Sequence, residues 1–255
     1  MIHSNQTSKS ETSTIYGLRP IMEALESGVR IDRVYFQNGL SGQLASSLKA
    51  RIHDGGIPFQ YVPAERLDRL AGGGNHQGVV ATISPIAYHH AIELIPALME
   101  REDAKPPVLI MLDRVTDVRN FGAIARTAEC AGADAIIIPD HGSAQVSDDA
   151  VKTSSGALLR LPVCRESNLK TVINLAHQCG MQVVAATEKG ATDYLAVDFK
   201  LPTLIILGAE ETGISPELLR LADQRACIPI LGQVQSLNVS VAAAIFLYEV
   251  LRQRR

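Results

Sequence analysis

The chain has 255 residues, 46% of them hydrophobic, and a formal net charge of −3 at pH 7. This length suits one or two domains with a sizeable core. The charge excludes a global positive field, so any binding of nucleic acid needs a local basic surface or recognition of shape. Trp is absent and aromatic residues make up only 4%, which argues against a platform that stacks many bases.

Cysteine and histidine spacing gives no sign of a metal site. None of the four cysteines has a CxxC partner, and each stands in or beside an apolar segment. We therefore expect reduced, buried thiols in a cytoplasmic protein. The seven histidines show no HExxH or similar ligand spacing. No apolar run approaches the roughly 18 residues of a membrane span.

The first 106 residues contain a tail, a small domain and a connector. Residues 1–13 are polar throughout and predict a disordered tail rather than a signal peptide. Residues 14–84 predict a small α/β domain, and residues 85–106 predict a connector with a helical pattern over Ala91–Arg101. Within the domain, the patterns indicate helices at Gly17–Glu26, Gln43–His53 and Ala64–Leu70 and strands at Ile31–Gln37, Pro58–Val62 and Gly78–Ile83.

Residues 107–255 form a second domain with a regular alternation of strands and helices. The strands are nearly continuous apolar runs, so we expect a parallel α/β sheet covered by helices on both faces. In such sheets ligands bind beyond the carboxyl ends of the strands. The predicted strands are Val108–Leu112, Ala135–Pro139, Leu161–Val163, Gln182–Ala186, Thr203–Leu207 and Ala226–Ile230.

The first notable strand end is "LDRVTDVRNFGAIARTAECAGA", in which a helix is predicted to begin near Asn120. Ile124, Ala128 and Ala131 form its apolar stripe. Arg126 points away from that stripe, and Gly122, one turn earlier, is expected to leave open space beside it. An Arg near a positive helix N-terminus suits a phosphate. The alternative is a surface Arg with Asn120 as an ordinary N-cap.

The second is "LIILGAEETGISPELL", where an apolar strand runs into Gly208, Ala209 and Glu210. Small residues at a strand end let a ligand approach the backbone. Glu210 would bind a cation or orient another side chain. The alternative is a tight turn with a solvated carboxylate.

The third is "IPILGQVQSLNVSVAAAIFLYEVL", whose polar residues Ser236, Asn238 and Ser240 exceed what one helix N-cap needs. The following helix is expected to bury a stripe of Val241, Ala244, Ile245, Tyr248 and Leu251. No GxGxxG opening a helix after a strand, no GxxxxGK[ST] and no GxSxG occurs in the chain. Dehydrogenases, P-loop NTPases and hydrolases are therefore disfavoured.

Together, the three stretches resemble the three motifs of the SpoU/TrmH family of RNA ribose 2′-O-methyltransferases, which have the SPOUT fold and use S-adenosylmethionine. The stretches "YGLRPIMEAL" and "NHQGVVATI" resemble the two ends of a ribosomal-protein-like substrate domain. That domain is found in the family's bacterial 23S rRNA guanosine-2′-O-methyltransferases. The resemblance covers all but the tail and the connector. It implies a parallel sheet with a C-terminal trefoil knot and a homodimer with active sites at the interface.

The resemblance also implies roles for individual residues. By position, Asn120 and Arg126 match the catalytic pair, Glu210 the carboxylate of the second motif, and Ser236 and Asn238 the polar pair of the third. Arg126 would either accept the ribose proton after desolvation or stay charged, bind a phosphate and stabilise the developing alkoxide. The backbone expected to hold the cofactor belongs to Leu207, Gly208, Ile228, Ile230 and Leu237.

Three other functions remain open at this point. A tRNA ribose methyltransferase differs from the rRNA enzyme only in its substrate, and the separation rests on the N-terminal resemblance. A catalytically silent RNA-binding protein is disfavoured because all the matched polar residues are present. A nucleotide-binding oxidoreductase is disfavoured by the missing glycine fingerprint. His76 and Arg19 are weak candidates for RNA contact, and a packed or solvent-exposed histidine is the favoured alternative for His76.

Overall fold

The computed structural model describes residues 14–102 and 105–255, so the predicted tail lies outside the described residues. Contacts divide the chain into two units. One holds the residues up to Ile86 together with Val146–Asp149, and the other holds Ala87–Gln145 and Ala150–Arg255. None of the described helices has the length and hydropathy needed to cross a membrane.

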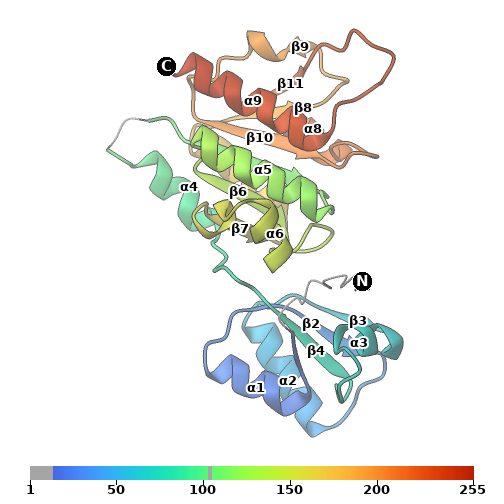
Figure 1. The fold of residues 1–255 in the computed structure, drawn as a ribbon. Coiled ribbons are helices and arrows are strands. Elements are labelled where there is room, and N and C mark those ends of the chain that lie inside the picture. The colour runs from blue at the N-terminus through green and yellow to red at the C-terminus, as the bar shows by residue number, and fades with distance from the viewer. Residues whose placement is uncertain (1–13, 103–104) are drawn as a thin grey trace, which may run out of the picture. The chain divides into compact units, whose positions relative to one another are not determined.

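The first unit is a mixed four-stranded sheet in the order β1-β4-β2-β3 (Figure 1). Strand β4 pairs antiparallel with β1 and β2, and β2 pairs parallel with β3. All six predicted elements are present to within one residue at each end, whereas the short edge strand β1 was not predicted. The elements are β1 Thr14–Tyr16, α1 Leu18–Glu26, β2 Ile31–Gln37, α2 Gln43–Asp54, β3 Phe59–Val62, α3 Ala64–Leu70 and β4 Val79–Ile83.

Both faces of this sheet are covered because side chains alternate along its strands. Val34 and Phe36 of β2 pack with α1 and α2 in one apolar cluster. Tyr35 faces the other way and packs with Leu67 of α3 in a second cluster. Figure 1 shows α1 and α2 together on one side of the sheet and α3 on the other. The unit thus has a core of its own.

The second unit is a seven-stranded, fully parallel sheet in the order β7-β6-β5-β10-β8-β11-β9, which confirms the predicted parallel α/β sheet. Its strands are β5 Val108–Asp113, β6 Ala135–Pro139, β7 Val163–Glu166, β8 Gln182–Ala186, β9 Thr192–Asp193, β10 Thr203–Gly208 and β11 Gln224–Cys227. Its helices are α4 Ala91–Met99, α5 Val118–Ala131, α7 Leu169–Gln178, α8 Pro216–Leu221 and α9 Val239–Gln253, while α6 Asp148–Thr153 spans the division between the units.

The central strands of this sheet are buried on both faces. Leu109 and Met111 of β5 belong to the cluster that includes α4, α7 and α8. Their neighbours Ile110 and Leu112 are equally buried and point to the opposite face. Helices α5 and α9 contact each other closely and lie side by side in Figure 1. This double coverage explains why the strands are apolar without alternation.

Three predictions in this unit were wrong in detail. The strand expected at Ala226–Ile230 ends at Cys227, because Pro229 has no N–H to donate to a sheet. The strand expected at Leu161–Val163 begins only at Val163. The region predicted as a connector contains α4, which packs Ala91 and Ile95 into the core of the second unit.

The apolar stripe predicted for the last helix was also wrong. Val241 and Tyr248 are 46% and 52% exposed in α9. The buried residues are instead Val239, Ala243, Phe246, Leu247, Glu249 and Val250. The helix carries apolar residues on two faces, and periodicity alone does not tell which of them meets the sheet.

All four cysteines are free, as expected, but Cys130 is exposed and only Cys164 is buried. Burial raises the pKa of the Cys164 thiol to about 12, and the nearby Glu166 carboxylate adds to the rise. Since thiolates rather than thiols react with alkylating reagents, the two residues should differ strongly in reactivity.

We therefore predict that iodoacetamide at about pH 8 modifies Cys130 and leaves Cys164 unmodified until the protein is unfolded in urea. Peptide mass spectrometry of the native and the unfolded samples measures both sites at once. Cys130 is the internal control. Equal labelling of the two thiols in the native protein would contradict the buried position of Cys164.

Candidate active site

A polar cluster joins the three stretches that the sequence singled out. The Asn120 Nδ2 donates to Glu210 Oε1 at 3.0 Å. The Asn238 Nδ2 donates to the same Glu210 oxygen at 2.5 Å and to Asn120 Oδ1 at 3.0 Å. Three turns separated by 28 to 118 residues along the chain are thus held together through one carboxylate and two amides.

Asn120 takes part in this cluster because it is not the helix cap. Helix α5 begins at Val118, and its N-cap is Asp117, whose side chain accepts from the Asn120 backbone N–H at 2.8 Å. The amide of Asn120 is therefore available for Glu210. The cap interpretation of Asn120 was wrong, and the orienting interpretation of Glu210 is the one that this geometry supports.

The two polar atoms of the Asn238 side chain have separate roles, one in capping a helix and one in the polar cluster. Its Oδ1 caps α9 by accepting from the Ser240 backbone N–H at 2.9 Å, and it also accepts from the Ser240 hydroxyl at 2.6 Å. Its Nδ2 remains free to donate to Glu210 and Asn120. An Asn at a cap thereby supplies two N–H donors to the site, which an ionised Asp at the same position would not.

Asp113 and Arg114, which the sequence analysis missed, hold the loop after β10. The buried Asp113 carboxylate accepts from the Ser215 backbone N–H at 2.6 Å and from Arg114 Nε at 3.1 Å. Arg114 has a positive φ of 59° and donates to the Gly213 carbonyl at 3.1 Å. An acidic residue ending a fully apolar strand was the available signal, because a buried carboxylate must have partners.

A cavity of about 370 Å³ lies beside this cluster, within the size range of small-molecule sites. It is lined by all five residues predicted to hold a cofactor, and also by Glu210 and Ser236. Asn120, Asn238 and Arg126 do not line it. The five are Leu207, Gly208, Ile228, Ile230 and Leu237.

The cavity is apolar at its base and charged at its edge. Val239 and Phe246 of α9 contribute buried apolar side chains to the lining. Thr187, Glu188 and Lys189, in the loop after β8, line it as well and were not predicted. Nothing in that loop's sequence distinguishes it from a solvated turn. The chemistry favours a ligand with a flat or apolar body and a polar end.

Two glycines serve packing rather than open space. A Cβ on Gly122 would lie 2.7 Å from the Thr153 Cβ, so the space expected beside this glycine is filled. A Cβ on Gly208 would lie 2.2 Å from the Gly213 carbonyl carbon. Gly208 therefore allows the 209–213 turn to fold back onto the strand end, where Gly213 N–H donates to the Ala209 carbonyl at 2.8 Å.

Arg126 is the one predicted catalytic residue that the fold keeps apart from the others. It is exposed on α5, two turns after Asn120. In the described part of the chain it has no hydrogen-bond or ion-pair partner. Groups of three or more potential metal ligands are also absent from the described residues.

The models of two protein families match the chain. Residues 107–248 match the model of the SpoU rRNA Methylase family, and residues 14–89 match that of RNA 2′-O ribose methyltransferase substrate binding. A Mycobacterium ulcerans protein named "Uncharacterized tRNA/rRNA methyltransferase" is 35% identical over 96% of this chain and 78% of its own length.

Two solved structures are similar over nearly the whole chain. The SpoU methyltransferase AviRb from Streptomyces viridochromogenes, in complex with AdoMet, has 26% identity and a TM-score of 0.59, covering 99% of this chain and 94% of its own. An AdoMet-bound rRNA methyltransferase from Sinorhizobium meliloti has 29% identity and a TM-score of 0.60, covering 94% and 86%. The chain belongs to the SpoU family of RNA methyltransferases.

The close approach at Gly208 predicts a large cost for a single added methyl group. We expect Gly208→Ala to lower the free energy of unfolding by about 1–3 kcal/mol, the usual penalty for overpacking. Gly232→Ala is the matched control, because a Cβ there meets nothing within 4 Å. Urea unfolding followed by circular dichroism compares the two variants. Equal stability of both would mean that the 209–213 turn does not lie against Gly208.

Proposed function

We propose that the protein transfers a methyl group from S-adenosylmethionine to a ribose 2′-hydroxyl of RNA, most specifically of a guanosine in 23S rRNA. The observation that carries the proposal is the meeting of three distant turns at one cavity. Glu210, which accepts from both Asn120 and Asn238, also lines the cavity. The AdoMet complexes of two similar proteins support the choice of cofactor.

The lining of the cavity fits this cofactor. Leu207, Ile228 and Leu237 offer apolar contacts and backbone polar groups for an adenine ring, while Glu188, Lys189 and Glu211 at the edge suit a charged amino-acid end. When bound, S-adenosylmethionine would supply a methyl group on a positively charged sulfur. A pocket with few charges at its base favours a reaction in which that charge is lost.

The polar residues have distinct proposed tasks toward the ribose. Ser236 lines the cavity and would orient the sugar together with Asn120. Glu210 and Asn238 would keep the loops in register through their shared hydrogen bonds. Holding the hydroxyl close to the methyl group, rather than strong acid–base chemistry, would provide much of the rate.

Arg126 is proposed to stay charged. A guanidinium holds its proton under nearly all conditions in proteins. Its role would then be to bind the phosphate next to the reacting ribose and to stabilise the developing alkoxide. The proton would leave to water.

The first unit is proposed to select the RNA, as its match to a substrate-binding model supports. His76 has a structural role there: its Nδ1 accepts from the Gly78 N–H at 3.0 Å, so its Nε2 faces Asp68 at 3.0 Å as the donor. Arg19 is exposed and remains the better candidate for a phosphate contact. The curated relative is named for both tRNA and rRNA, so tRNA is the alternative substrate.

A homodimer is proposed to complete the active site. Four apolar residues of the 230–238 loop and α9 are largely exposed, with a relative exposure of at least 46%. They are Leu231, Val234, Val241 and Tyr248. Exposed apolar residues of this number mark an interaction surface. A second copy would cover these residues. It would also bring its own Arg126 to the first chain's cavity, which the first chain's Arg126 does not line. We also propose that the C-terminal segment is knotted, as the resemblance implies.

The target is tested by mapping ribose methylation in total RNA from cells lacking the gene and carrying either the wild-type gene or Arg126→Ala. We expect one guanosine of 23S rRNA to lose its methyl group and only the wild type to restore it. Purified Arg126→Ala should bind S-adenosylmethionine within about twofold of the wild type in calorimetry, because Arg126 lies outside the cavity. Loss of a tRNA methyl group instead would establish the alternative, and no loss at all would favour a silent RNA-binding protein.

The dimer proposal predicts complementation between two inactive variants. Arg126→Ala has an intact cavity, and Leu237→Trp, which fills the cavity, has an intact Arg126. If Arg126 acts across the interface, randomly mixed dimers recover about a quarter of the wild-type activity, since half are mixed and each mixed dimer has one complete site. The activity of the mixture after co-refolding measures this. A mixture that stays inactive would place Arg126 at the cavity of its own chain, and a monomer in light scattering would contradict the dimer.

A further inference from the structure

One wall of the cavity belongs to a segment that ends far from it. Residues 187–200 leave β8 at the cavity, where Thr187, Glu188 and Lys189 line it, and then run through β9 and a 3₁₀ turn at Tyr194–Ala196. The start of this segment lies against β11, since the Thr187 N–H donates to the Ala226 carbonyl at 2.9 Å. The Cβ position of Gly190 is only 2.4 Å from the Arg225 carbonyl oxygen.

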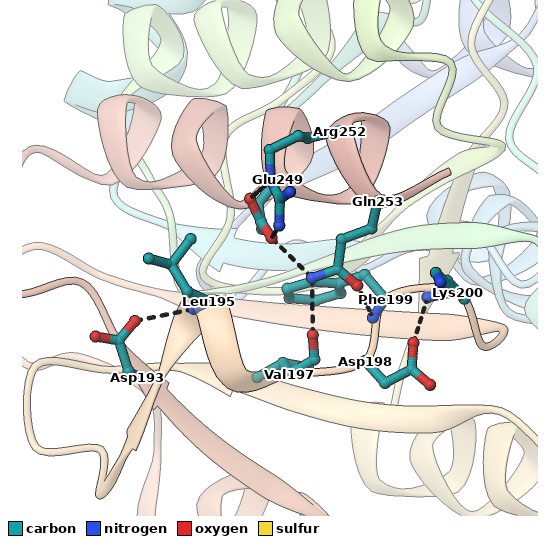
Figure 2. Close-up of polar contacts among 9 residues, drawn as sticks. All are labelled: Asp193, Leu195, Val197, Asp198, Phe199, Lys200, Glu249, Arg252 and Gln253. Carbon is teal, nitrogen blue, oxygen red and sulfur yellow. Dashed lines mark hydrogen bonds and ion pairs between the residues drawn. The ribbon is translucent and has the colours of Figure 1, made fainter. Parts of the chain in front are cut away.

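A side chain of α9, Gln253, holds the far end of the same segment, as Figure 2 shows. Gln253 Nε2 donates to the Val197 carbonyl at 2.9 Å, and its Oε1 accepts from the Phe199 N–H at 2.9 Å. One side-chain amide thus pairs with two backbone groups of residues 197–199, which belong to no helix or strand. Such groups are costly to leave unpaired in the interior.

Glu249 determines which way the Gln253 amide points. Its Oε1 accepts the second Gln253 Nε2 proton at 2.7 Å, and a carboxylate has no proton to offer in return. Glu249 is only 5% exposed, and its charge is balanced by Arg252, which donates from Nε and from a terminal nitrogen at 2.7 Å each (Figure 2). Arg252 also lowers the pKa of the Glu249 carboxyl, which keeps it ionised.

Two aromatic rings connect this bracket to the cavity. Phe246, one of the cavity-lining residues, is 1% exposed. Its ring is flanked by Tyr194 at 5.9 Å and Phe199 at 6.2 Å between centroids, both edge to face. Tyr194 and Phe199 lie on the very segment that Gln253 holds. The segment that Gln253 holds thus forms part of the packing around the Phe246 ring.

We propose that Gln253 is a positioning residue for the cofactor: its bracket on residues 197–199 sets the Phe246 wall of the cavity. Gln253 does not line the cavity itself, so it acts through these groups. The inference rests on the proposed function, since it assigns S-adenosylmethionine to this cavity. It extends that function to a residue outside the three motifs.

The test compares Gln253→Met, which keeps the length and bulk of the side chain but forms neither backbone hydrogen bond, with the wild type. We expect its dissociation constant for S-adenosylmethionine to rise about tenfold in calorimetry. With RNA from cells lacking the gene as acceptor, the KM for the cofactor should rise similarly and kcat should change less than about twofold. A purely structural role would not produce this split.

Val250→Ala is the matched control, because Val250 is 5% exposed on the same helix and does not line this cavity. It should lower the melting temperature at least as much as Gln253→Met while leaving cofactor affinity unchanged. Tyr194→Leu removes one flanking ring, and its effect on affinity should be less than additive with that of Gln253→Met.

The outcomes separate this inference from the proposed function. Wild-type protein that binds no S-adenosylmethionine overturns the proposed function. If the wild type binds it and Gln253→Met binds equally well, only the positioning role is wrong. If Val250→Ala loses as much cofactor affinity as Gln253→Met, Gln253 contributes only to general stability and the positioning role is wrong. Strictly additive effects of Gln253→Met and Tyr194→Leu on affinity would contradict that role as well.

Discussion

The site depends on one carboxylate that accepts from two amides. Glu210 Oε1 receives Nδ2 of Asn120 from the start of α5 and Nδ2 of Asn238 from the start of α9. These side chains come from three different strand ends, and each is held by its own local structure: a helix turn capped by Asp117, a glycine-closed turn and a helix cap. Hydrogen bonds with an ionised acceptor are stronger than neutral ones, so a single such group can fix three loops.

The sheet makes this meeting possible. Strands β5 and β10 pair directly in register, from Val108 with Thr203 to Asp113 with Gly208. Their carboxyl ends therefore lie next to each other, and Asp113 reaches the loop that follows β10 through the Ser215 N–H. Helix α5 starts at the loop after β5, and it packs against α9, which starts after the loop that follows β11. The rigid sheet thus fixes where these loops begin and end, while the loop side chains lie outside the packed core and can contact a ligand.

Support for the cavity extends well beyond the residues that line it. At one end of α9 Asn238 belongs to the polar cluster, and at the other end Glu249 and Gln253 hold the segment that packs on Phe246. Arg254, the next residue, also holds this segment, because it donates to the carbonyls of Phe199 and Leu201. The last helix therefore connects the polar cluster to the opposite wall of the cavity. Its second apolar face stays exposed in the single chain, which is consistent with a partner surface.

The sequence by itself predicted most of the elements, the parallel sheet and the three residues Asn120, Glu210 and Asn238 that meet in one polar cluster, because strand runs, helix periods and motif residues are local. The resemblance also named the five residues that line the cavity with Glu210 and Ser236. Only the tertiary structure decided which face of α9 is buried, that Asn120 is not a cap, that Thr153 fills the space beside Gly122 and that α4 belongs to the second core. Two apolar faces on one helix look alike in a sequence, and a glycine looks the same whether a ligand or a neighbouring backbone occupies its missing side chain. The roles of Asp113 and Gln253 were likewise visible only once segments 54 to 102 residues apart came into hydrogen-bond contact.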